Sequence, residues 1–160
     1  MSVGQFLVPG AGKTIRLAGV TAVFKVVDDR KPGDYVVLEV TADPNFTGPG
    51  PHMHSTLEEL FYVLDGEFDF FVGNEVQRVG AGSFINVPPG VMHDYRNPGT
   101  TPARFLGIAS PAGLDRYFED IRDLIASGNL HDAEALRQLR LRHDTLEPEG
   151  TPPGHWTLRQ

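Results

Sequence analysis

The sequence predicts an all-β sandwich or barrel that is followed by a short helical extension. Short apolar runs recur from residue 20 to residue 109, and clusters of Gly, Pro, Asn and Asp separate them. Many short strands with such turn residues between them are typical of β-sandwiches and barrels. After residue 110 the apolar residues follow a helical period instead. A chain of 160 residues can form one domain with a substantial core.

Six strands are expected in the first part of the chain, within a barrel that spans residues 1–111. Residues 59–64 have apolar side chains on both faces, which is typical of a strand that other protein covers on both sides. Turns such as Asp65-Gly66 separate the runs, because Gly and Asp tolerate turn conformations. The predicted strands are 20–27, 35–40, 59–64, 67–72, 83–87 and 103–109.

Helices are expected over residues 112–146. Ser110 is suited to be the N-cap of the first helix, Pro111 to be its first residue and Gly128 to end it. The apolar positions at helical spacing are Leu114, Phe118, Ile121, Leu124 and Ile125, then Ala133, Leu136 and Leu139. We expect these helices to pack on the outside of the barrel or at a dimer contact, and a lid over its cavity is the less favoured alternative. Residues 147–160, with three prolines and two glycines, are predicted to form an irregular tail.

Composition limits the partners of the protein. A net charge of −7 and the lack of any run of Lys or Arg argue against nucleic-acid binding. No apolar stretch reaches membrane-spanning length and the N-terminus lacks the core of a signal peptide, so we expect no membrane partner and a cytoplasmic location. The chain has no cysteine, which excludes disulfides within it.

Three histidines and a glutamate form the candidate metal-binding set. His52 and His54 stand two residues apart, and in a strand such side chains point to the same face. Glu59 shares a face with Phe61 at the start of the next predicted strand, whereas Glu58 has the opposite parity and is expected in solvent or behind the site. Imidazole suits zinc, copper, iron and nickel, and a carboxylate ligand adds manganese.

These residues resemble the two sequence motifs of the cupin family. The first motif is His-x-His, a gap of three or four (four in this chain), Glu, a gap of six, then Gly. The second is Gly, five residues, Pro-x-Gly, two residues, His, three residues, Asn. The matching residues are His52, His54, Glu59, Gly66, Gly82, Pro88, Gly90, His93 and Asn97. One position departs from the pattern: Phe46 stands where the family has a glycine, with Gly48 and Gly50 nearby.

The resemblance covers roughly residues 35 to 110. It implies a jelly-roll β-barrel with one divalent transition metal ion (Fe, Ni, Mn, Zn, Co or Cu) bound by His52, His54, Glu59 and His93. It also implies a homodimer. Four protein ligands leave one or two positions open in a five- or six-coordinate site, and such openness distinguishes catalytic from structural metal sites. A cation in an apolar cavity favours an anionic oxygen ligand, such as an enolate or a phenolate.

The leading functional hypothesis is a metal-dependent dioxygenase that acts on a small hydroxy-ketone or a flavonol-like aromatic molecule and consumes O2. The stretch Ser110-Pro111-Ala112-Gly113-Leu114, followed by Phe118, is similar to the segment after the barrel in quercetinase-like cupins. Glu59 would then be both a metal ligand and the general base.

Two alternatives remain open. One is a metal-dependent polyketide cyclase or isomerase, which uses no oxygen, and the other is a cupin that binds a small molecule without catalysis. No appended DNA-binding segment supports the binding-only alternative, and one fold hosts many functions.

Overall fold

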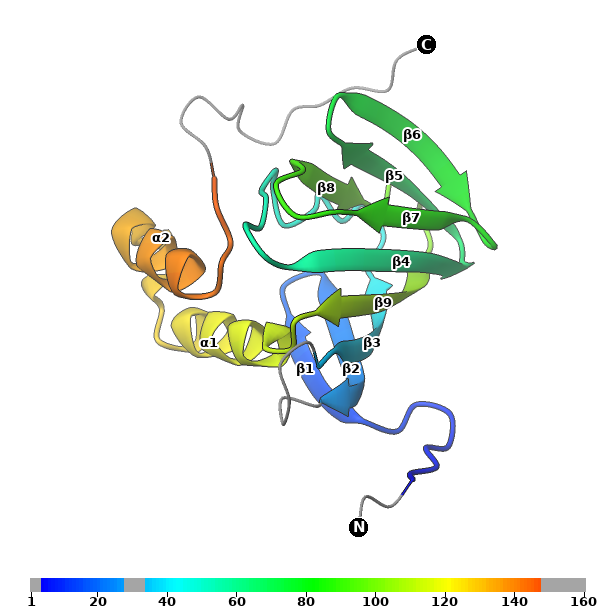
Figure 1. Cartoon of the computed structure of the whole chain (residues 1–160), viewed down its shortest axis with the longest axis horizontal. Helices are drawn as coiled ribbons and strands as arrows, with labels where there is room; N and C mark the ends of the chain where they lie inside the picture. Colours follow the sequence, from blue (N-terminus) through cyan, green and yellow to red (C-terminus); the bar gives the residue numbers. More distant parts are fainter. Residues whose placement is uncertain (1–3, 28–33, 148–160) are drawn as a thin grey trace.

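Two antiparallel sheets form the jelly-roll barrel of the protein (Figure 1). The computed structural model describes residues 4–27 and 34–147. The strand order is β1-β2-β3-β9-β4-β7 in the six-stranded sheet and β6-β5-β8 in the three-stranded sheet. The strands are β1 (Lys13–Leu17), β2 (Val20–Val27), β3 (Val36–Ala42), β4 (Glu58–Asp65), β5 (Glu67–Val72), β6 (Glu75–Gly80), β7 (Phe84–Val87), β8 (His93–Arg96) and β9 (Ala103–Ser110).

The six predicted strands are present as β2, β3, β4, β5, β7 and β9, with ends that differ from the prediction by at most two residues. Strands β1, β6 and β8 were not predicted. All three lie at the edge of a sheet. An edge strand is paired on one side only, and its sequence needs fewer apolar residues than a central strand. β8, with the sequence His-Asp-Tyr-Arg, has no aliphatic residue at all.

The core follows the alternation of the central strands. In β3 the side chains of Val36, Leu38, Val40 and Ala42 are buried, and those between them are half-buried. Aromatic rings from both sheets meet inside the barrel at centroid distances between 5.1 and 6.4 Å. These rings are Phe61, Phe68, Phe70, Tyr95 and Phe105. Ring pairs at such distances stabilise a core beyond the area that they bury.

The helical extension consists of α1 (Leu114–Ala126), a short 3-10 turn at Asn129–His131, and α2 (Ala133–Arg142). The prediction that Ser110 caps the first helix is wrong. Ser110 instead ends β9, where it pairs with Glu58 of β4, and the helix begins at Leu114 after its N-cap Gly113. Continued strand pairing therefore outweighs the local capping preference of Ser110. Gly128 follows the end of α1 in a left-handed conformation (φ 76), as predicted.

The helices pack against the barrel and against each other. The Lys13 ammonium of β1 lies 2.9 Å from both the Asp115 and the Glu119 carboxylates of α1. Phe118 packs edge to face on Phe24 with ring centroids 5.5 Å apart. Within the described ranges, no helix is long and apolar enough to cross a membrane. The predicted irregular tail lies, from residue 148 onward, outside the described residues.

Candidate metal centre

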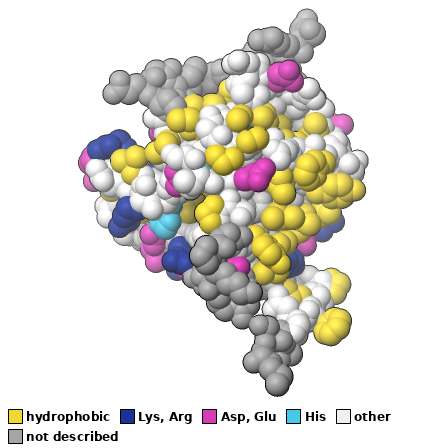
Figure 2. Space-filling model, in the orientation of Figure 1, with side chains coloured by type: hydrophobic (Ala, Val, Ile, Leu, Met, Phe, Trp, Pro, Cys, Tyr) yellow, Lys and Arg dark blue, Asp and Glu magenta, His cyan; other side chains and the backbone are white. Residues whose placement is uncertain are grey.

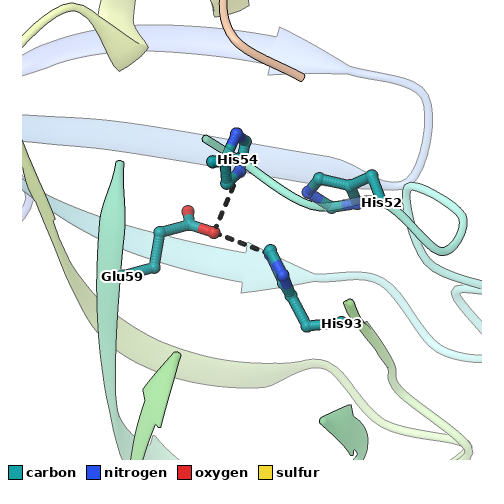
Figure 3. Close-up of side chains that lie close together, drawn as sticks. All are labelled: His52, His54, Glu59 and His93. Carbon is teal, nitrogen blue, oxygen red and sulfur yellow. Dashed lines mark hydrogen bonds and ion pairs between the residues drawn. The ribbon is translucent and has the colours of Figure 1, made fainter. Parts of the chain in front are cut away.

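The structure brings the four predicted ligands together. One ligand atom from each of His52, His54, Glu59 and His93 lies within 4.8 Å of the others (Figure 3). Glu59 comes from β4 and His93 from the start of β8. His52 and His54 do not lie in a regular strand, contrary to the prediction. They lie in an extended segment, where the His52 and His93 backbones exchange hydrogen bonds of 3.0 and 2.8 Å.

The two neighbouring glutamates point to opposite faces of β4. Glu59 is buried, and its Oε2 atom lies 2.8 Å from His93 Nε2 and 3.3 Å from His54 Nε2. Glu58 accepts a hydrogen bond of 3.0 Å from the Asn86 side chain on the outer face. The period of two in a strand thus places Glu59 with the histidines and Glu58 away from them.

Each histidine of the cluster has its Nδ1 atom against a backbone carbonyl. The distances are 2.7 Å from His52 to Gly50, 2.7 Å from His54 to Asp144, and 3.0 Å from His93 to Val91. A carbonyl oxygen only accepts, so Nδ1 carries the proton in each ring. Binding of Nδ1 in this way orients the ring and leaves Nε2 as the atom that can coordinate a metal ion.

The protonation states are set by burial and by the facing charges. Burial lowers the pKa of His52 to about 3, which keeps that ring neutral. Burial also opposes the charged form of His54, but the Glu59 carboxylate and the Asp144 carbonyl outweigh it and the pKa of His54 is raised. Burial would raise the pKa of Glu59, yet the His54 and His93 rings hold that pKa well below its usual range. Glu59 is therefore an anion, the form that ligates metals.

One buried atom supports a metal ion in this cluster. His54 Nε2 has no hydrogen-bond partner among the described residues, although a Glu59 oxygen lies 3.3 Å away. A buried polar atom without a partner costs about 1–3 kcal/mol. Donors bound about 2.1 Å from one ion lie at most about 4.2 Å apart, so the widest separation, up to 4.8 Å, has to shorten by about 0.6 Å or more on binding. The four residues fit a divalent transition metal ion, for which imidazole and carboxylate are suitable ligands.

The cluster opens onto a cavity of about 240 Å³. Its walls are mostly apolar and come from both the barrel and the helices. The barrel side includes Leu38, Val40, Phe46, Phe61, Tyr95 and Phe105, and the helix side includes Leu114, Tyr117, Phe118, Ile121, Ile125, Leu136 and Arg140. Side chains of the helices thus form part of the cavity wall. Tyr117 and Arg140 were not identified from the sequence, because nothing local indicates that they reach a barrel cavity.

The glycines of the two motifs have backbone roles. Gly66, Gly82 and Gly90 all have positive φ, at 73°, 88° and 78°, which L side chains rarely adopt. A Cβ at Gly66 would also lie 2.8 Å from the Ala103 side chain. Gly66 and Gly90 shape the turns next to β4 and β8, which carry Glu59 and His93, and Gly82 shapes the turn between β6 and β7.

The motif asparagine is also structural. Asn97 is buried, and its side-chain amide donates to the carbonyls of Ala42, Asp43 and Thr101 at 3.2, 3.0 and 2.8 Å. Its Oδ1 atom accepts a hydrogen bond of 2.9 Å from the Gly99 amide. Asn97 therefore ties the loop after β8 to the end of β3.

Phe46, which replaces the expected glycine, lies in the cavity wall and packs on Tyr95 with centroids 5.9 Å apart. The tight approach occurs at Gly48 instead. There φ is 94°, and a Cβ would lie 2.5 Å from Asp94 Oδ1 and collide with the Tyr95 carbonyl. In this chain the position that requires glycine is therefore 48, two residues after the position where the family has it.

Comparison with known proteins agrees with this geometry. Residues 38–109 match the family described as Cupin domain. An uncharacterised protein of Methanocaldococcus jannaschii is 35% identical over 60 residues, which are 38% of this chain and 48% of that protein. The match thus spans about half the length of that relative.

Three solved structures share the fold. KdgF from Halomonas sp. has a TM-score of 0.62 at 19% identity, over 71% of this chain and 99% of that one. An RmlC-like cupin from Shewanella frigidimarina has a TM-score of 0.61 at 21% identity, over 71% and 96%. The polyketide cyclase RemF from Streptomyces resistomycificus has a TM-score of 0.57 at 23% identity, over 67% and 79%. The jelly-roll barrel, both cupin motifs and the family match over residues 38–109 together support placing this chain in the cupin superfamily.

Proposed function

We propose that this chain is a metal-dependent dioxygenase that acts on a small hydroxy-ketone or a flavonol-like aromatic molecule. The observation that supports it most is the position of the His52, His54, Glu59 and His93 cluster on the wall of an apolar cavity of about 240 Å³. Apolar pockets with a few placed polar groups are typical of sites for small organic molecules. A divalent ion bound by these residues would stabilise negative charge on an enolate or phenolate oxygen of the substrate.

Glu59 is proposed to take the proton of the substrate hydroxyl. Its carboxylate is buried and charged, and it faces the histidines from the start of β4. The low pKa of Glu59 makes it a weak base, so the substrate hydroxyl must itself be acidic. The enol-type hydroxyl of a hydroxy-ketone or flavonol fits that requirement better than an ordinary alcohol.

Aromatic side chains are proposed to hold the body of the substrate. Phe46, Phe61, Tyr95 and Phe105 on the barrel side, and Phe118 on the helix side, line the same cavity. Rings of this kind hold a flat aromatic molecule through stacked or edge-to-face contacts. The α1 and α2 side chains exclude water from that space, which strengthens the charge interactions inside it.

Metal analysis combined with an oxygen electrode tests this proposal. The wild type should retain or take up one divalent ion, and His93→Ala should lose it. With flavonols or related hydroxy-ketones, the loss of substrate absorbance should require O2 and match its uptake. Glu58→Gln is the matched control, because Glu58 neighbours the site in sequence but lies on the outer face. A wild type that takes up no ion would refute the proposal.

The alternative with the most support is a polyketide cyclase or isomerase. The chain shares its fold with the polyketide cyclase RemF, and the same cluster could stabilise an enolate without any oxygen chemistry. Turnover that continues at the same rate without O2 would favour this alternative. Ligand binding without turnover of any tested substrate would favour a non-catalytic cupin.

We also propose a homodimer formed through the outer face of the six-stranded sheet. Tyr62, Leu64 and Phe84 are 45%, 38% and 61% exposed on β4 and β7, and Figure 2 shows hydrophobic side chains gathered over this face. Exposed apolar patches of this kind mark interaction sites. Light scattering should give twice the chain mass of 17.5 kDa, and Phe84→Glu should lower it; a monomeric wild type would contradict the proposal.

A further inference from the structure

His54 differs from the other two histidines of the cluster in what holds its ring. The carbonyls that bind Nδ1 of His52 and His93 belong to residues two positions earlier in the barrel. The carbonyl that binds Nδ1 of His54 belongs to Asp144, which is 90 positions later, beyond α2. The barrel alone therefore orients two of the three imidazoles, and the third depends on the helical extension.

The Asp144 side chain holds the loop that joins two members of the cluster. Asp144 Oδ1 accepts from the Ser55 amide at 2.9 Å. Asp144 Oδ2 accepts from the Thr56 amide and hydroxyl, both at 2.8 Å, and from the Leu57 amide at 3.3 Å. Ser55, Thr56 and Leu57 are all but one of the residues between His54 and Glu59. One carboxylate thus determines the path of the chain from one ligand to the next.

The neighbouring residues extend this connection to His52. Met53 and Leu146 exchange two backbone hydrogen bonds, of 2.9 and 2.8 Å, and Met53 stands between the two histidines of the first motif. Asp144 itself has φ 54, a left-handed conformation that directs its carbonyl and its carboxylate to the same loop. Asp and Asn adopt this conformation more readily than other non-glycine residues.

We propose that Asp144 is a positioning residue of the metal centre, through which docking of the helical extension controls the affinity of the cluster for its ion. A carbonyl that holds Nδ1 fixes both the proton and the orientation of a ligand histidine, and loss of such a contact typically weakens metal binding 10- to 100-fold. Because coupling between two events is reciprocal, metal binding also strengthens the docking of residues 144–146. The proposal rests on metal binding by the cluster, as does the proposed function.

Two substitutions at Asp144 remove all or part of the carboxylate contacts and keep the backbone carbonyl that faces His54. Asp144→Gly removes the carboxylate and suits a positive φ. Asp144→Asn keeps one oxygen acceptor, so it loses either the bond to Ser55 or the bonds to Thr56 and Leu57. The matched control is Asp132→Asn, because the Asp132 carboxylate also accepts from two backbone amides, those of Glu134 and Ala135, at the distant start of α2.

Binding of Co²⁺ to the metal-stripped full chain is measured by chelator competition, together with the visible spectrum of the bound ion and the melting temperature. Without the carboxylate contacts the Asp144 carbonyl is no longer held against His54, so we expect the affinity to fall by up to about 10- to 100-fold for Asp144→Gly, less for Asp144→Asn and not at all for Asp132→Asn. The Co²⁺ spectrum, which reports the ligand set, should change only in the Asp144 variants. If Asp144→Gly does not fold, Asp144→Asn decides the question.

The outcomes are distinguishable. If the Asp144 variants keep the wild-type affinity and spectrum but melt at a lower temperature, Asp144 stabilises only the fold. That outcome would overturn this inference and leave the proposed function intact. A wild type that binds no Co²⁺ would overturn the proposed function and this inference with it.

Discussion

Glu59→Gln should destabilise the protein even when no metal ion is bound. Glu59 is buried, and its Oε2 atom lies 2.8 Å from His93 Nε2, which donates to it in the metal-free protein when the imidazole carries a proton on both nitrogens. A hydrogen bond to a charged group contributes about 1.5–3 kcal/mol. Glutamine preserves the volume and one oxygen but not the charge, so we expect a loss of about 1.5–2 kcal/mol. At about 2–4 °C per kcal/mol for a chain of this size, the melting temperature should fall by roughly 3–8 °C.

The pH dependence of this loss follows from the two pKa shifts. The pKa of Glu59 is lowered, so its contribution is present above its unfolded pKa and is lost as the pH falls through the folded value. The pKa of His54 is raised, so its contribution is present below its unfolded pKa and is lost as the pH rises through the folded value. Both groups are charged between these limits, and the effect of Glu59→Gln should be largest at about pH 5–6.

Thermal unfolding of the EDTA-treated protein between pH 4.5 and pH 8 measures the effect. The control is Glu58→Gln, since Glu58 lies on the outer face and bonds only the Asn86 side chain among the contacts described above. That substitution should stay within about 0.5 kcal/mol of the wild type. Equal losses for the two variants, or a loss for Glu59→Gln that does not change with pH, would refute the reasoning.

Three further predictions concern the ligands and the turns. Affinity for Co²⁺ should already fall as the pH drops below about 7, because bound histidines must be neutral and the pKa of His54 is raised; equal affinities at pH 5 and pH 7.5 would contradict this. Gly48→Ala should cost about 1–3 kcal/mol more in urea unfolding than Gly50→Ala, because both have positive φ but only Gly48 has atoms in the way. Asn97→Ala should cost about 2–4 kcal/mol, since it removes the partner of three backbone carbonyls and one backbone amide. An unchanged urea midpoint would contradict the role of Asn97 in holding the loop after β8 to the end of β3.

Six strands and three members of the cluster, His52, His54 and Glu59, could be predicted from the sequence because they depend on local spacing. His93 joined them through the resemblance to the second cupin motif. A period of two distinguishes Glu59 from Glu58 without any knowledge of the rest of the fold. The edge strands β1, β6 and β8 could not be predicted in this way. Each is stabilised by pairing with a neighbouring strand, β2 or β5, and its own sequence has no clear strand pattern. The start of α1 was wrong for a related reason: Ser110 is a good helix cap in isolation, but pairing with Glu58 keeps it in the sheet.

The sequence by itself determined that four residues of this chain, His52, His54, Glu59 and His93, are suited to one metal ion inside a barrel. The tertiary structure decided what surrounds them. Tyr117 and Arg140 reach the cavity, and Asp144 binds His54, only because α1 and α2 dock on the barrel. These contacts join residues 90 or so positions apart in the chain. Packing of apolar surfaces, which has no local signature, brings them together.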